Sequence, residues 1–102
     1  MDTSLDRLTA DDFTPLVGET FAFDAGEPGR FELELLEVNA AAGPGVPTAE
    51  RMPFELLFRG PAEPVFAQQI FPLEHAALGR LDIFLVPVAR DQDGARYEAI
   101  FS

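Results

Sequence analysis

The segment LDIFLVPVARDQDGARYEAIF, residues Leu81–Phe101, decides the fold. Two apolar runs, Leu81–Arg90 and Ala95–Phe101, flank a polar stretch that contains Asp93-Gly94. An Asp-Gly dipeptide between two apolar runs is a strong short-range signal of a β-hairpin. The segment therefore predicts two antiparallel strands joined by a two-residue turn at Asp93-Gly94.

This turn fixes the predicted register of the hairpin. Asp91 then faces Arg96, and Pro87 faces Ile100 at a pair that exchanges no hydrogen bonds. A proline within a strand is tolerated beside an edge, a bulge or a sheet corner. Because Ile83–Val88 is apolar on both faces, we expect this strand to lie at an open seam, covered by another chain or by the N-terminal segment. The residues predicted at this interface are Ile83, Leu85, Val86 and Pro87, together with Leu57 of an earlier strand.

The rest of the sequence predicts further short strands and one short helix. In Phe31–Val38, apolar and acidic residues alternate, and Leu36 shifts the phase by one residue, which indicates a β-bulge or a strand end buried on both faces. We expect an all-β domain with one short N-terminal helix and about six antiparallel strands in a small barrel or sandwich. The expected strands are Thr20–Phe23, Phe31–Val38, Pro53–Arg59, Gln69–Glu74, Leu81–Arg90 and Ala95–Phe101.

Residues 1–18 are expected to act as a helical plug at one end of the barrel. Thr9 can cap a short helix over Leu8–Asp12, and two carboxylates in its first turn suit the positive end of the helix dipole. The apolar side of this helix should bury Phe13 and Leu16, since an open barrel end would expose phenylalanines to water.

The strand Pro53–Arg59 follows a stretch, residues 40–50, that is rich in proline and glycine and is expected to form a long loop. On this strand Leu57 faces outward and needs cover from the loop, from the helix or from a partner chain. The residues expected to face inward are Phe54, Leu56 and Phe58. The chain has ten phenylalanines, and roughly eight or nine of them should lie in the core, where each contributes about 1.5–3 kcal/mol.

Composition narrows the function classes. The chain has 102 residues, of which 47% are apolar, so we expect one domain over residues 1–102 with its own core. Asp and Glu number 18 against 7 arginines, and the net charge of −11 argues against binding to nucleic acid or to an anionic membrane. No cysteine is present, which excludes a disulfide scaffold and a thiolate nucleophile. The N-terminus lacks an apolar run typical of a signal peptide, so a cytoplasmic location is expected, or export as part of a particle.

Candidate catalytic residues are few. The serines, Ser4 and Ser102, lie at the chain ends, where order is least expected. The single histidine, His75, could act as a general base with a nearby carboxylate. The favoured interpretation is a structural histidine whose ring bonds a backbone carbonyl, because no partner nucleophile is visible. We therefore predict no enzymatic activity, no cofactor and no metal site.

Two charged patterns have structural interpretations. Asp91-Gln92-Asp93-Gly94 resembles the start of a calcium loop, but Ala95 and Ser102 stand where the fifth and twelfth ligands would lie. The arginines concentrate at strand ends, where they are expected to pair with carboxylates. A sharper hypothesis is that Arg51 and Arg59, on either side of PFELLF, orient buried or interfacial acids.

Three segments resemble one family. LTADDFTPLVGETF (Leu8–Phe21), RMPFELLFRGP (Arg51–Pro61) and LGRLDIFLVPVARDQDGARYEAIF (Leu78–Phe101) are similar to a bacterial family known only as a domain of unknown function. Some members are encoded beside proteins that resemble phage-tail-collar (microcystin-dependent) proteins. The resemblance implies no catalytic residues, and it favours a setting in a tail-like particle or a surface appendage.

Three functional hypotheses follow. The leading one is a non-enzymatic structural or assembly module that self-associates or binds a protein partner, most simply as a homo-oligomer or as part of a larger assembly. The second is a small-ligand-binding or enzymatic barrel that uses His75 and carboxylates. The third is an acidic mimic that occupies the basic site of a nucleic-acid-binding protein, for which the charge should concentrate on one face.

Overall fold

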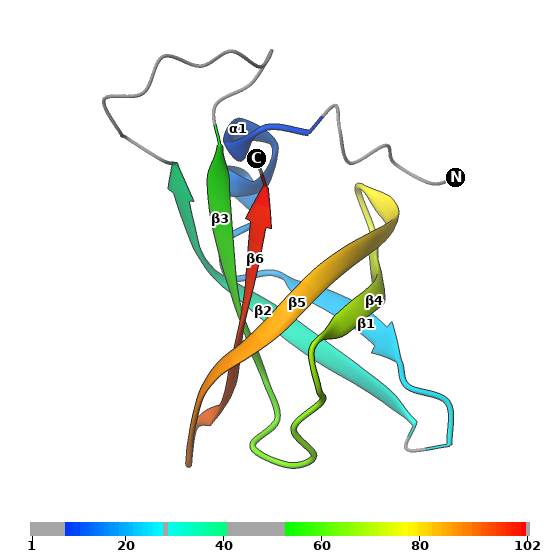
Figure 1. The fold of residues 1–102 in the computed structure, drawn as a ribbon. Coiled ribbons are helices and arrows are strands. Elements are labelled where there is room, and N and C mark those ends of the chain that lie inside the picture. The colour runs from blue at the N-terminus through cyan, green and yellow to red at the C-terminus, as the bar shows by residue number, and fades with distance from the viewer. Residues whose placement is uncertain (1–7, 28, 41–52, 102) are drawn as a thin grey trace.

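The computed structural model describes residues 8–27, 29–40 and 53–101, which form six strands and two short helices. All neighbouring strands are antiparallel, and their order β1-β2-β3-β6-β5-β4 closes into a barrel (Figure 1). The predicted all-β class is confirmed, with a barrel rather than a sandwich. The elements are α1 (Ala10–Phe13), η2 (Thr14–Leu16), β1 (Thr20–Asp24), β2 (Arg30–Ala40), β3 (Phe54–Gly60), β4 (Gln69–His75), β5 (Gly79–Asp91) and β6 (Gly94–Phe101).

The alternating patterns place the strands within one or two residues of their observed bounds. In β2, the register with β3 shifts between Leu35 and Glu37, so of the two interpretations of the phase shift at Leu36 the bulge is the one that the structure supports. Apart from Ala40, which ends β2, the loop predicted over residues 40–50 lies outside the described residues. Arg51, the first of the two arginines that bracket PFELLF, also lies outside them.

The N-terminal helices lie against the barrel end where β3 begins and β6 finishes (Figure 1). Thr9 is the N-cap of α1, as predicted, and the Asp12 carboxylate completes a capping box by accepting a 2.8 Å hydrogen bond from the backbone N–H of Thr9. Phe13 is fully buried, and its ring lies 5.8 Å from the rings of both Phe54 and Phe101. Leu16 is also buried, as the sequence predicts. Neither helix of the described chain is long enough to cross a membrane.

Aromatic side chains fill the barrel interior. Seven of the ten phenylalanines are buried, fewer than expected, together with the ring of Tyr97. Phe31 and Phe66 are half-buried and pack against each other edge to face. Phe84 lies outside the barrel, with 51% of its surface exposed. The inward residues predicted on β3, namely Phe54, Leu56 and Phe58, are all buried.

The hairpin turn is displaced from its predicted position. Gly94 pairs with Asp91, so Gln92 and Asp93 form the turn and the predicted pairing of Asp91 with Arg96 is wrong. The Asp91 carboxylate closes the turn by accepting a 2.8 Å hydrogen bond from the N–H of Asp93. Gly94 instead begins β6, with φ +140°, where a Cβ would lie 2.2 Å from the carbonyl oxygen of Gly60. Glycine is therefore required at position 94 by the close approach of β6 to the end of β3, and not by the turn.

Strand β5 passes from one neighbour to another at its middle. Leu85 is the last residue that pairs with β4, and Val86 is the first that pairs with β6. Pro87 is opposite Tyr97, so its predicted pairing with Ile100 is wrong. It lies beside a bulge at Val88, one of the settings in which a strand tolerates proline. The predicted open seam is wrong, because β1 pairs with β4 and closes the barrel, but beyond Leu85 one side of β5 has no neighbouring strand among the described residues. Pro87 therefore lies both beside a bulge and in a part of β5 that extends past β4, and each of these settings tolerates the missing N–H of proline.

Candidate functional site

A shallow hollow lies on the outer surface where β1 joins β4. Its floor is Ala22, which stands between Glu32 of β2 and Glu74 of β4 in the strand register. The small side chain of Ala22 and the missing side chain of Gly79 leave a volume of about 640 Å³. The lining residues are Thr20, Ala22, Arg30, Glu32, Glu74, His75, Ala76, Gly79 and Arg80.

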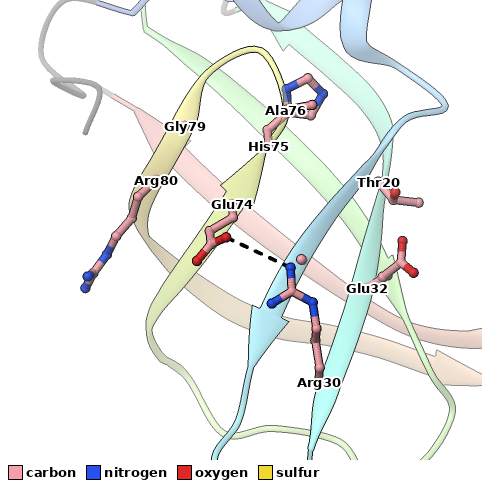
Figure 2. Close-up of a pocket in the computed structure, with 9 residues that line it drawn as sticks. Thr20, Arg30, Glu32, Glu74, His75, Ala76, Gly79 and Arg80 are labelled. Atoms are coloured by element: carbon pink, nitrogen blue, oxygen red, sulfur yellow. Dashed lines mark ion pairs between the residues drawn. The ribbon is translucent and has the colours of Figure 1, made fainter. Parts of the chain in front are cut away.

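Charged side chains of both signs border this hollow. Figure 2 shows Glu74 directed across β1 toward Arg30, and the two groups form an ion pair at 3.9 Å. Both side chains are more than half exposed, and such pairs contribute little to stability. The side chain of Arg80 is turned away from this pair and bonds Asp82 at 3.1 Å. The two arginines and two glutamates therefore give the hollow no net charge.

His75 ends β4 and lies almost completely buried beside this hollow. Its Nδ1 accepts a 3.0 Å hydrogen bond from the N–H of Ala77, which places the proton of the neutral ring on Nε2. Nε2 lies 2.7 Å from Glu19 Oε1 and donates to it. The ring also packs on Phe21, with centroids 4.7 Å apart. The structural interpretation of His75 fits this geometry, but its partners are a backbone N–H and a carboxylate instead of the expected carbonyl.

The bond from His75 to Glu19 fastens the barrel where it closes. Strands β1 and β4 are joined by only two register pairs, Ala22 with Glu74 and Phe23 with Leu73. The bond to Glu19, the residue before β1, adds a third connection at one end of this short junction. Both ring nitrogens are engaged, so the ring could act as a base or a ligand only after one of these two hydrogen bonds breaks.

We expect His75→Ala to lower the free energy of unfolding by about 2 kcal/mol or more, since a hydrogen bond to a charged partner contributes about 1.5–3 kcal/mol. Glu19→Gln, whose amide oxygen can still accept from Nε2, should cost less than about 1 kcal/mol. Urea denaturation of both variants measures the difference. An equal loss in both would show that the charge of Glu19, and not the hydrogen bond, stabilises the junction.

The other arginines of the described chain form surface ion pairs. Arg59 bonds Glu34, Arg90 bonds Glu63 at 2.8 Å, and Arg96 pairs with Asp91 at 3.4 Å. All five arginines in the described part of the chain thus have a carboxylate partner, as the pattern of arginines predicts. Within the described residues, no three histidine and carboxylate side chains are close enough to hold a metal ion.

The residues predicted at an interface separate into two groups. Ile83 and Leu85 face the core and are buried, so neither can contact a partner in this fold. Leu57, Val86 and Pro87 are half-buried. The strand register places Leu57 and Val86 in one outward row, on either side of Glu98.

The sequence pattern did not predict the exposed apolar residues of this region. Ile70 of β4 is directly opposite Phe84 of β5, and their surfaces are 62% and 51% exposed. Val88, at the bulge, is 51% exposed as well. Alternation along β5 could have found Phe84, because inward Ile83 and Leu85 require an outward residue between them. We call Ile70, Phe84, Val86 and Val88 the β5 outer face.

One family model, described as "Domain of unknown function (DUF6916)", matches residues 8–101. The chain belongs to this family. The DUF6916 match spans both helices and all six strands, so the whole described barrel is the family's domain. The predicted type of family, a domain of unknown function, is confirmed, and its description assigns no activity and no site residues. No curated protein and no solved structure matches the chain.

Proposed function

We propose that this DUF6916 protein is a non-enzymatic assembly module that binds another protein chain through the β5 outer face. The observation that carries the proposal is the exposed apolar pair Ile70–Phe84, continued along β5 by Val86 and Val88. Apolar side chains gathered on neighbouring strands of a soluble domain are typical of an interaction surface. The phenylalanine at its centre is a residue type enriched at such interfaces.

The backbone of β5 favours contact through side chains over strand addition. Beyond Leu85, β5 has no pairing with β4, which leaves one edge of Val86–Asp91 without a neighbouring strand among the described residues. Pro87 and the bulge at Val88 both disrupt the regular ladder that an added strand would need. We therefore propose docking onto the outer face, with a tail-like particle or surface appendage as the setting that the family resemblance implies.

The other functional hypotheses have less support. The enzymatic one needs a free His75 ring, and both of its nitrogens already have partners within the fold. The acidic mimic needs a dense acidic face, whereas five carboxylates of the described chain are paired with arginines. Neither His75 nor the distribution of carboxylates therefore supports a second proposed function.

We expect Phe84→Glu to abolish capture of a native partner while leaving the fold intact, because Phe84 is half exposed. The matched control is Val17→Glu, which places the same charge on an apolar residue that is 46% exposed and precedes β1. Affinity capture from the native host would identify the partner, and light scattering on the two purified proteins would measure the complex. Equal binding by wild type and Phe84→Glu would contradict the proposal.

A further inference from the structure

A row of outward residues crosses four strands next to the β5 outer face. Glu37 of β2 is opposite Leu57 of β3, Leu57 is opposite Glu98 of β6, and Glu98 is opposite Val86 of β5. In the next row, Glu55 of β3 is opposite Ile100 of β6, which is 68% exposed. Carboxylates and apolar side chains therefore alternate on this surface. We use the name mixed row for five residues of these two rows taken together: Glu37, Leu57 and Glu98 of the first, and Glu55 and Ile100 of the second.

The three carboxylates of the mixed row are not offset by arginine in the described structure. Each of the five described arginines has an ion pair at 4.0 Å or less, and the partners are Glu74, Glu34, Asp82, Glu63 and Asp91. Glu37, Glu55 and Glu98 are not among them. The mixed row therefore presents three carboxylates that are spaced by apolar side chains and have no described arginine partner, in a chain with a net charge of −11.

We propose that the occupant of the β5 outer face and the mixed row is a different protein whose contact surface carries arginine or lysine around an apolar centre. A second copy of this chain is disfavoured, because a two-fold contact would place the three carboxylates of both copies in one interface, with no described arginine in the mixed row to offset them. Arginine and lysine fit alternating rows, since their aliphatic stems cover apolar side chains while their charged ends reach carboxylates. This inference rests on the proposed function and specifies the chemistry of the partner.

The test uses the whole chain labelled with ¹⁵N and two short synthetic peptides that alternate leucine with arginine or leucine with glutamate. We expect the arginine peptide to shift amide signals of β3 and β6 around Leu57, Glu98 and Ile100, and the glutamate peptide to shift none of them. Glu37→Gln/Glu55→Gln/Glu98→Gln should weaken binding at least about tenfold. The control Glu27→Gln/Glu32→Gln/Asp93→Asn changes the net charge equally, at exposed residues outside this surface, and should bind as wild type does.

Two outcomes would overturn the inference. Equal weakening by both triple variants would mean that the peptide senses only the total charge of the chain. A wild-type dimer in light scattering that Phe84→Glu dissociates would mean that the occupant is a second copy, and the proposed function would then still stand. By contrast, a partner that binds Phe84→Glu normally contradicts the proposed function, whatever the peptides do.

Discussion

Phe13→Ala should lower the free energy of unfolding by about 3–5 kcal/mol, the usual cost of removing a buried aromatic ring. The ring of Phe13 has no exposed surface and contacts Phe54 and Phe101, whose own rings stack 4.6 Å apart. Its loss would leave a cavity between the N-terminal helix and the barrel end. Denaturant unfolding followed by circular dichroism measures the effect.

The chain offers a matched control for this substitution. Phe84→Ala removes the same ring from the outside of the barrel, where half of it is already in water. We expect a loss below about 1 kcal/mol, in keeping with surface substitutions. If both variants unfold at the same denaturant concentration, Phe13 does not close the barrel.

Gly94→Ala is the second substitution with a large expected effect. A side chain at φ +140° is strained by about 1–3 kcal/mol, and a Cβ would lie 2.2 Å from the backbone oxygen of Gly60. Because that oxygen belongs to β3, the clash can be relieved only by moving a strand, which adds about 1–3 kcal/mol. We expect a destabilised protein with a lower melting temperature.

Gly26→Ala separates strain from the clash. Gly26 has φ +82°, and a Cβ there would meet nothing within 4 Å. This control should show the cost of a positive φ without a clash, so the excess loss in Gly94→Ala measures the clash with β3 together with the greater strain at φ +140°. Equal losses would remove the clash as the reason for glycine at position 94.

Strand positions follow from local alternation, and this is why they could be predicted. Leu33 and Leu35 face inward on β2 because every second residue does, and the break in the pattern at Leu36 became a real bulge. The hairpin register could not be predicted in the same way. Gly94 is placed by Gly60, 34 positions away in the numbering of the sequence, and no local pattern encodes that contact.

The candidate binding surface could likewise be predicted only in part from the sequence. The apolar residues on both faces of Ile83–Val88 identified the correct strand. They could not show which side chains point outward, because that depends on which face of the strand packs against the core. The inward positions of Ile83 and Leu85 made Phe84 the exposed residue. The pairing of Ile70 with Phe84, and of Leu57 with Glu98, depends on the register between strands and required the fold.

The central claim is that another protein binds over Phe84, and site-specific photo-cross-linking tests it most directly. A photoreactive phenylalanine analogue at position 84, expressed in the native host, should give one discrete cross-linked product that mass spectrometry can identify. The same analogue at position 32, an exposed site on the outside of β2, should give none. Cross-links from position 32 equal to those from position 84, or none from either, would contradict the assignment of the β5 outer face as the binding surface.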